Sequence, residues 1–301
     1  MSGPTGAQFE IASGAARAII TEIGATLRGF EVDGQCCVES FDAGAEPPMG
    51  SGAVLIPWPN RTRGGRWEFE GSTQQLPITE PARGNAIHGL VRRVRWQVIT
   101  HTGSLISLGV GIKAQPGWPV PLWVTISYAV DGDGLTVTHG VHNVGDRPVP
   151  FGVGAHPYLR VGMVETDDCA LRLAATTHLP LSPETMTPEG VAVPVAGTDL
   201  DFRSRRPVRG TRLDDVFGGC EPDADGLIRH CLYGGGKAVE MWTDLAFSWV
   251  QVYTADRFPG RGRAIAVEPM TCPPDALNSG TDLITLTPGA AWSGRWGLTS
   301  R

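Results

Sequence analysis

The clearest structural signal in this chain is the run LWVTISYAVDGDGLTVT at residues 122–138. Between Leu122 and Val130, apolar side chains occupy every second position, which is the period of a β-strand with one buried face. Residues 131–134 (DGDG) have the residue types of a tight turn. Residues 135–138 then begin a return strand with the same alternation. The run therefore predicts an antiparallel hairpin.

Similar alternation recurs along the chain, whereas helical periodicity is nearly absent. Further strands are expected near residues 16–23, 27–32, 94–100, 104–112, 169–174, 238–243, 248–253 and 292–298. Residues 63–66 (RGGR) predict a second hairpin that joins the segment after Pro59 to residues 67–70 (WEFE). No repeat of fixed period is present, which disfavours a propeller.

These patterns predict an all-β, antiparallel fold with two large sheets packed face to face. No composition shift divides the chain, so residues 1–301 are expected to form a single domain. Segments 41–59 and 180–210 are rich in proline and serine and are expected to be long loops. A concave sheet face would be the natural ligand site.

Composition and charge exclude several classes of function. The net charge is −6 and no basic block is present, which argues against nucleic acid as a partner. No apolar stretch reaches the roughly 18 residues of a membrane helix, and the first 18 residues lack the pattern of a secretory signal. The six cysteines include no Cys-x-x-Cys pair and are expected to be reduced thiols in a cytoplasmic protein. A Cys220–Cys231 disulfide across a hairpin is the alternative.

Residues 264–270 (AIAVEPM) predict a strand that carries a carboxylate, Glu268. Ile265 and Val267 would share one face, and the alanines and Glu268 the other. Pro269 is expected to end the strand. A carboxylate on a face lined by alanine would have open space before it and could meet a small ligand. The alternative is a surface glutamate at a strand end.

Residues 151–158 (FGVGAHPY) repeat this logic around His156. If the segment is extended, His156 shares a face with Gly152 and Gly154, and these glycines would let a ligand approach closely. Phe151 and Val153 would pack on the other face. The ordinary pKa of histidine lies near neutral pH, which makes His156 a candidate acid or base. The alternative is a histidine satisfied within the core.

Four other polar residues lie in suggestive contexts. His88, in the loop NAIHG, suits hydrogen bonding to a ligand hydroxyl or, alternatively, stabilises a turn. Arg61 follows IPWPN, where two prolines would fix its position and Trp58 could offer an apolar plane to a sugar. Asp214, in LDDVF, is either a ligand contact or a turn residue. Gln251, in WVQVY, weakly indicates a polar contact in a cleft.

Other catalytic signatures are missing from the sequence. His139 is expected in the core, with His142 on the opposite strand face, so these two histidines are not a metal pair. No other cluster of His, Cys and Glu has ligand spacing. The sequence contains neither a phosphate-binding loop nor a serine-hydrolase elbow.

Taken together, these segments resemble the aldose 1-epimerase family, also called galactose mutarotase, from about Gly14 to the C-terminus. The similar motifs, in chain order, are Asn60-Arg61 with Gly65 and Trp67, Asn85-x-x-His88-Gly89, Gly154-x-His156-Pro157-Tyr158, residues 213–217 with Asp214, and Glu268-Pro269. Thr62 departs from the isoleucine of the family pattern. Each motif alone is weak, but five in the family's order are specific.

The resemblance implies a large antiparallel β supersandwich that interconverts the α and β anomers of a free aldose, without a metal or an organic cofactor. Glu268 is expected to be the base toward the C1 hydroxyl, and His156 the acid toward the ring oxygen. Arg61, His88 and Asp214 are expected to hold sugar hydroxyls. Asn60 and Gln251 are further candidates for substrate binding.

Three alternatives remain open at this point. A glycosidase would need two acids facing one bond, and a non-catalytic carbohydrate-binding protein would need no acid–base pair. A mutarotase for an anionic hexose, a 6-phosphate or a sulfonated sugar, would need additional cations. Five arginines lie near the motifs in sequence: Arg83, Arg92, Arg93, Arg261 and Arg263. The expected partner is a small aldose, neither nucleic acid nor a membrane, and the chain is expected to be a monomer or homodimer.

Overall fold

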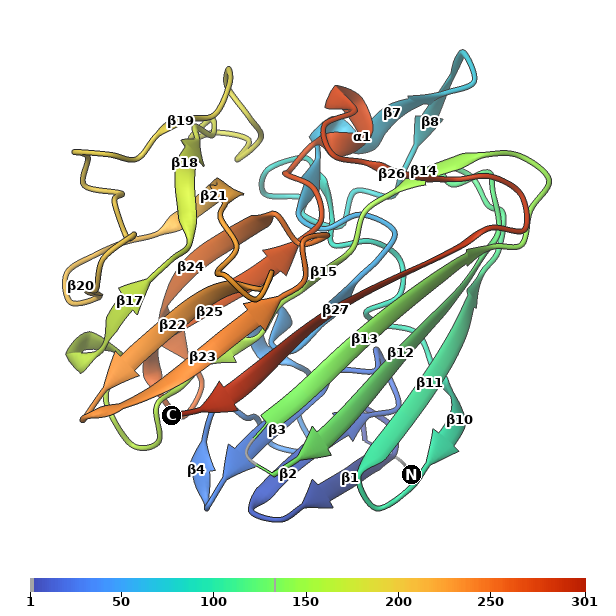
Figure 1. Ribbon diagram of the computed structural model, residues 1–301. Helices are drawn as coiled ribbons and strands as arrows, with labels where there is room; N and C mark the ends of the chain where they lie inside the picture. The colour runs from blue at the N-terminus through green and yellow to red at the C-terminus, as the bar shows by residue number, and fades with distance from the viewer. Residues whose placement is uncertain (1–2, 133) are drawn as a thin grey trace.

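The computed structural model describes residues 3–132 and 134–301. Nearly all regular structure in these residues is β, and every pairing between named strands is antiparallel. Figure 1 shows long strands side by side in one curved layer, with β24 and β25 behind them. The fold is therefore the all-β antiparallel architecture that the alternation predicts.

The larger layer is a nine-stranded sheet. Its strands, in spatial order, are β10 (Gln97–His101), β11 (Leu105–Ile112), β12 (Leu122–Asp131), β13 (Gly134–Asn143), β27 (Ala291–Ser300), β23 (Lys237–Thr243), β22 (Ile228–Gly234), β17 (Ala170–Arg172) and β20 (Arg206–Pro207). The C-terminal strand β27 lies at its centre, between the β12–β13 hairpin and β23.

The second layer is an eight-stranded sheet. Its strands, in spatial order, are β19 (Val193–Pro194), β18 (Ala175–Leu179), β21 (Asp214–Cys220), β24 (Trp249–Phe258), β25 (Gly262–Met270), β15 (Gly154–Ala155) and β5 (Val54–Leu55), with β16 (Tyr158–Leu159) also paired to β25. Strand β25 is thus central and collects neighbours from distant parts of the sequence.

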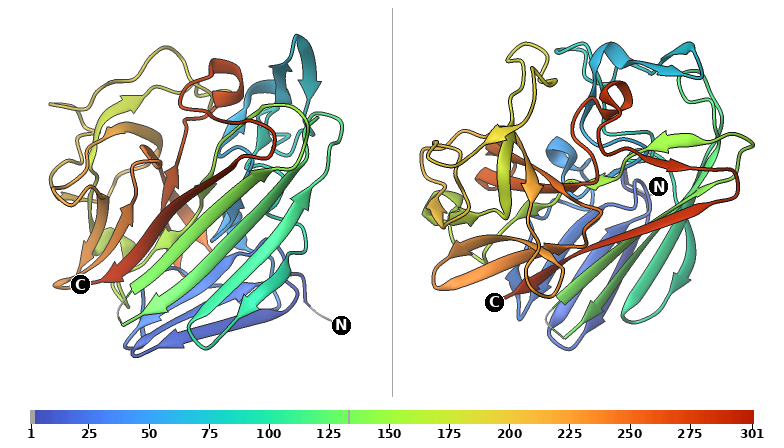
Figure 2. Two further views of the ribbon diagram at one scale, coloured as in Figure 1. Left: turned by 45° about the vertical axis from the view of Figure 1, so that its right-hand side comes forward. Right: turned by 45° about the horizontal axis from the view of Figure 1, so that its top comes forward.

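Smaller elements surround the two layers. A four-stranded sheet contains β1 (Gln8–Ser13), β2 (Ala16–Thr21), β3 (Leu27–Val32) and β4 (Gln35–Cys36). Three pairs are β6 (Arg61–Thr62) with β9 (Ala86–Ile87), β7 (Arg66–Phe69) with β8 (Ser72–Gln75), and β14 (Val149–Phe151) with β26 (Ile284–Leu286). Three 3-10 turns span Pro48–Gly50, Arg63–Gly65 and Thr166–Asp168, and the short helix α1 (Ala276–Ser279) lies near β7–β8 at one end of the molecule (Figure 2).

The hydrophobic core lies between the two large sheets. Inward-facing residues of β12 and β13, such as Ile126 and Val137, belong to the same buried cluster as Ile265 and Val267 of β25. Alternating burial along β12 confirms the predicted pattern, since Leu122, Val124, Ile126, Tyr128 and Val130 are all buried. One face of β25 is therefore fixed by the core, and Glu268 lies on its other face.

The predicted strands are present, with ends shifted by a few residues. Asp131 and Gly134 pair across the turn of the β12–β13 hairpin; Asp133, within the predicted turn, lies outside the described residues. The hairpin predicted across residues 63–66 is wrong. Strand β6 pairs with β9, and β7 pairs with β8, so the chain turns away at 63–65 instead of folding back.

Pro269 does not end its strand, contrary to the prediction. Strand β25 continues to Met270, with Pro269 opposite Val250 and Met270 opposite Trp249. Proline lacks an N–H but can accept a hydrogen bond and adopts extended backbone, so it is tolerated near a strand end.

All six cysteines are free thiols, so the Cys220–Cys231 disulfide does not form. Among the described residues, no helix is long and apolar enough to cross a membrane.

His139 lies in the core, as predicted, and its environment has a consequence for stability. It is fully buried, and its Nε2 accepts a hydrogen bond from Trp296 Nε1 at 2.9 Å. Burial lowers the pKa of His139 to about 3. The folded protein therefore keeps this imidazole neutral at pH values where the unfolded chain protonates it.

The pKa of His139 is lower in the folded protein than in the unfolded chain. Its contribution to the free energy of unfolding is therefore fully present above the unfolded pKa of about 6.5 and is lost as the pH falls toward 3. Between these two pKa values, this one group changes the free energy of unfolding by about 1.4 kcal/mol per pH unit. His139→Gln retains an acceptor for Trp296 without a titrating ring. Urea unfolding at pH 7 and pH 5 should show a loss of stability about 2 kcal/mol smaller in this variant than in the wild type. Equal losses would contradict the assignment.

Candidate functional site

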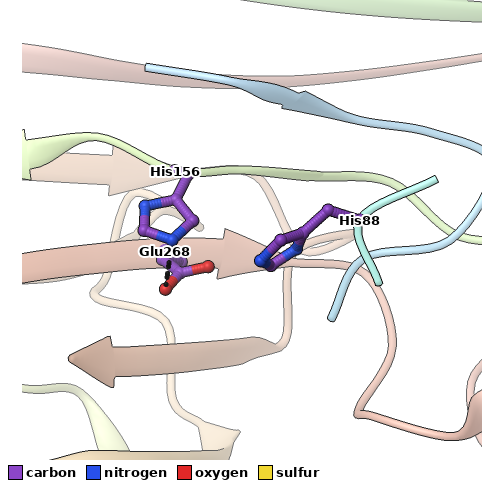
Figure 3. Close-up of side chains that lie close together, drawn as sticks. All are labelled: His88, His156 and Glu268. Carbon is purple, nitrogen blue, oxygen red and sulfur yellow. Dashed lines mark ion pairs between the residues drawn. The ribbon is translucent and has the colours of Figure 1, made fainter. Parts of the chain in front are cut away.

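The centre of the site is a buried contact between His156 and Glu268. Nε2 of His156 lies 3.3 Å from Oε1 of Glu268, and the two residues are only 5% and 2% exposed. Figure 3 shows the imidazole of His156 directly over the carboxylate, with one ring nitrogen of His88 pointing toward the pair. Glu268 Oε2 and His156 Nδ1 have no hydrogen-bond partner within residues 3–132 and 134–301. Both atoms are buried, so the pair has unused hydrogen-bonding capacity within the protein.

Strand β25 positions Glu268 because its core-facing side chains hold the strand in place. Ile265 and Val267 enter the core, as predicted, and Glu268 lies on the opposite face. The expectation of open space on that face is wrong, because Tyr158 and Phe258 cover the alanines. Tyr158 also stacks on His156, with ring centroids 5.3 Å apart and an interplanar angle of 29°. The aromatic cover excludes water and holds the imidazole plane.

The glycines before His156 serve packing and not a ligand, which corrects the prediction. A Cβ on Gly152 would lie 2.3 Å from Cys272 Sγ, and one on Gly154 would lie 2.8 Å from Pro59 Cβ. The missing side chains let the 56–60 loop approach this segment. The same loop carries Asn60 and leads into Arg61, whose charge acts on both His156 and Glu268.

His88 is held in one tautomer by a reciprocal contact with Asn60. The His88 N–H donates to the Asn60 carbonyl at 2.9 Å, and the Asn60 N–H donates to His88 Nδ1 at 3.2 Å. Both residues have positive φ, 64° and 55°, which places the two backbones in this arrangement. Since Nδ1 accepts a hydrogen bond, Nε2 of the neutral ring must carry the hydrogen. His88 therefore offers an N–H donor to the site.

A chain of hydrogen bonds joins the other predicted residues. Asn60 Nδ2 donates to Gln251 Oε1 at 3.0 Å, and Gln251 Nε2 donates to Asp214 Oδ1 at 2.8 Å. Gln251 pairs directly with Glu268 across β24 and β25. The sheet thus places a buried amide between the two carboxylates and fixes the orientation of Asp214.

Arg61 is anchored by Glu80, a residue that no sequence motif indicated. Its Nε and Nη2 donate to the two carboxylate oxygens of Glu80, both at 2.9 Å, whereas Asp214 Oδ2 lies 3.9 Å from Nη2. Glu80 lies in the loop between β8 and β9 and belongs to no motif. Only the tertiary structure reveals this pairing, because the two residues are adjacent neither in sequence nor in a predicted hairpin.

Burial shifts the pKa values of the central groups in the directions that favour their neutral forms. It raises the pKa of Glu268 well above its usual range, helped by the charge of Asp214 and opposed by Arg61. Burial lowers the pKa of His156 to about 4 and that of His88 well below its ordinary value. Burial therefore favours the neutral forms of both Glu268 and His156.

Two cavities lie near the pair, and neither is lined by His156 or Glu268 themselves. The larger, about 590 Å³, is lined by residues that include His88, Glu80 and Arg92, and the smaller, about 440 Å³, by residues that include Asp214 and Tyr253. Met49 lines both. His88 and Asp214 therefore line different cavities, which share Met49, a residue that no motif indicated.

Trp58 does not offer a surface to a sugar, contrary to the prediction. It is 3% exposed and packs against Trp118 at a centroid distance of 6.1 Å. Met49, Ile23 and Ile87 are among the apolar side chains that line the larger cavity, and Met49, Leu213 and Tyr253 are among those that line the smaller.

The five arginines near the motifs differ in their surroundings. Arg261 pairs with Glu39 and Glu165, Arg263 with Asp167, and Arg83 lies near Glu80. Arg92 and Arg93 instead line the larger cavity and, within the part of the chain that the structure describes, form no ion pair.

The donor set of the site fits proton transfer better than metal binding. One potential ligand atom from each of His88, His156 and Glu268 lies within 4.8 Å of the others. To ligate a metal through Nε2, His88 would need its hydrogen on Nδ1, facing the Asn60 N–H donor. This tautomer would place two donors against each other, so His88 is suited to donate to an oxygen.

Comparison with known proteins places this site in a family. The family model described as aldose 1-epimerase matches residues 7–299. This chain belongs to the aldose 1-epimerase family. Within the family, the chain is 32% identical over 286 residues to the uncharacterized protein YihR of Escherichia coli, covering 95% of this chain and 90% of YihR. It is 31% identical over 239 residues to mouse galactose mutarotase, covering 72% and 66% of the two chains.

Solved structures share the fold of this aldose 1-epimerase family member. An aldose epimerase homologue from C. elegans superposes with a TM-score of 0.85 at 19% identity, covering 98% of each chain. A galactose 1-epimerase from Lactobacillus acidophilus superposes with a TM-score of 0.80 at 20% identity, covering 96% of this chain and 92% of that chain. The galactose mutarotase-like fold expected from the motifs is therefore confirmed.

The tautomer of His88 is directly measurable. Long-range ¹H–¹⁵N correlation spectra of the histidine rings at neutral pH should show His88 with hydrogen on Nε2 and an acceptor at Nδ1, because the Asn60 N–H occupies Nδ1. The signals are assigned by their loss in His88→Gln. Hydrogen on Nδ1 would contradict this geometry and would reopen Nε2 for a metal ion.

Proposed function

We propose that this protein is an aldose 1-epimerase that interconverts the α and β anomers of a free hexose such as glucose or galactose. The observation that carries the proposal is the buried His156–Glu268 contact at 3.3 Å, beside cavities lined by His88 and Asp214. Membership in the aldose 1-epimerase family supports it.

The reaction requires two proton transfers at neighbouring atoms of the sugar. Glu268 takes the proton of the C1 hydroxyl while His156 gives a proton to the ring oxygen, and the C1–ring oxygen bond breaks to leave an open-chain aldehyde. Rotation about C1–C2 exposes the other face of the carbonyl. The reverse transfers then close the ring as the other anomer.

This scheme conserves the single proton of the pair. Ring opening needs Glu268 as carboxylate and His156 as imidazolium, and it leaves both groups neutral, which are the forms that burial favours. The bound sugar supports the charged state, since its C1 hydroxyl donates to the carboxylate and its ring oxygen accepts from the imidazolium. Each positioned acid or base supplies about 10²–10⁴-fold acceleration.

The surrounding residues bind and orient the sugar. The N–H of His88 and the guanidinium of Arg61 donate to sugar oxygens, and Asp214 accepts from hydroxyl groups further round the ring. Asn60 and Gln251 fix these groups through the hydrogen bonds already described. Orientation lowers the barrier because the reacting atoms are held within reach of the proton-transfer groups.

Polarimetry on freshly dissolved α-D-glucose and α-D-galactose should show faster equilibration with protein than with buffer. Glu268→Gln and His156→Asn should each lose about 10²–10⁴-fold in rate, because each removes one proton-transfer group. Circular dichroism should show both variants folded. Glu70→Gln and His101→Asn, which change an exposed pair partner and an exposed strand residue, are matched controls and should retain full activity.

A wider panel distinguishes the alternatives. If no neutral, phosphorylated or sulfonated hexose equilibrates faster with protein than with buffer, the enzymatic proposal fails. Binding of a sugar without any acceleration would instead identify a non-catalytic carbohydrate-binding protein.

A mutarotase for an anionic hexose is the second candidate, favoured by Arg92. This side chain is partly buried in the larger cavity, which it shares with His88. Burial and the neighbouring charge of Arg93 lower the pKa of Arg92, which is the situation of a cation lacking an acid partner. A phosphate or sulfonate group on the sugar would supply that partner.

Arg92→Gln separates the two substrates. If the substrate is anionic, the variant should raise KM for hexose 6-phosphate or 6-sulfonate by roughly 10–100-fold, the value of a charge-assisted hydrogen bond, and leave KM for glucose unchanged. Arg95→Gln, at an exposed arginine paired with Glu22, is the matched control. Acceleration confined to neutral sugars, with no effect of Arg92→Gln, would eliminate the anionic candidate.

A further inference from the structure

Glu80 contacts the site although it belongs to none of the motifs. Its two oxygens accept from Nε and Nη2 of Arg61 at 2.9 Å each, in the bidentate arrangement that gives strong and directional pairing. Asn85 Nδ2 also donates to Oε2 of Glu80 at 3.3 Å, and Arg83 Nε lies 3.8 Å from Oε1. The carboxylate is therefore held in place from its own loop while it holds Arg61.

The position of Glu80 decides which acid pairs with Arg61. Asp214 lies farther away, at 3.9 Å, and its Oδ1 is occupied by Gln251. Arg61 is 8% exposed, so water screens its charge poorly. The guanidinium therefore interacts electrostatically with Glu268. Without Glu80, the guanidinium would be free to turn toward Asp214 or Glu268.

We propose that Glu80 is a positioning residue of the sugar site that fixes the guanidinium of Arg61 and balances its charge. The proposal rests on the acid–base role given above to Glu268. Glu80 itself need not touch the reacting atoms.

The physical reason lies in the charges that surround Glu268. The groups that face or influence it are His156 and Tyr158 from the β15–β16 segment, His88 from the loop after β9, Arg61 from β6, and Asp214 from β21. Tyr253 of β24 also interacts electrostatically with Glu268. Arg61 alone in this set is permanently cationic. An unbalanced cation favours the carboxylate form and weakens the base.

Glu80→Gln tests this idea, because it keeps the shape of the side chain and removes its charge. The pH above which the His156–Glu268 pair loses its single proton should fall by up to about one unit, since Arg61 then stabilises the carboxylate. The upper limb of the pH profile of kcat/KM should move to lower pH by the same amount. At the optimum, kcat/KM should fall roughly 10–100-fold through misplacement of Arg61.

Two further variants make the result specific. Glu80→Asp restores the charge and should return the upper limb to its wild-type position, even if the shorter side chain leaves kcat/KM reduced. Glu70→Gln makes the same change at an exposed glutamate that pairs with Arg147, and it should behave like the wild type. A Glu80→Gln protein with reduced stability or raised KM, but an unmoved upper limb, would show that Glu80 is merely structural.

A second readout does not depend on turnover. An NMR titration of the His156 ring in the sugar-free protein reports the proton loss of the pair in wild type and in Glu80→Gln. The shift toward lower pH is expected there as well, and an unchanged titration would overturn the proposal. If no sugar is turned over, this measurement still tests the role of Glu80. Failure of the proposal for Glu80 is therefore distinguishable from failure of the proposed function.

Discussion

The 3.3 Å contact between His156 and Glu268 is the interaction on which the rest of the site depends. Two titratable groups buried to 5% and 2% exposure are costly unless they share a proton and are held firmly. The fold meets this requirement from several sides. The core anchors the far face of β25, Tyr158 stacks on the imidazole, and Gln251 lies opposite Glu268 across the sheet.

Asn60 connects this pair to the substrate-binding groups. Its backbone fixes His88, and its amide is bonded to Gln251 and to the Arg61 N–H. These contacts join three segments that are remote in sequence, namely the loop before β6, the loop after β9 and strand β24. The network leaves few alternative hydrogen-bond partners, so each polar side chain has a defined direction before any sugar arrives.

Strand alternation was predictable from sequence because the period of two is local. The run at residues 122–138 indicates a buried face without knowledge of its partner, and the structure confirms it. Pairing is not local, however. Residues 63–66 have the composition of a hairpin turn, yet β6 pairs with β9 and β7 with β8, because longer-range contacts outweigh the local turn preference.

The sequence by itself determined the all-β class, the ordered motifs of the aldose 1-epimerase family and the residues around which the site is built. Tertiary structure alone decided what surrounds them. Gly152 and Gly154 make room for Cys272 and Pro59, where the sequence suggested a ligand, and Trp58 is packed within the core. Glu80 pairs with Arg61 from a loop without any motif. The physical reason is that motifs record residue types and spacing along the chain, whereas burial, pairing and pKa depend on neighbours brought together by folding.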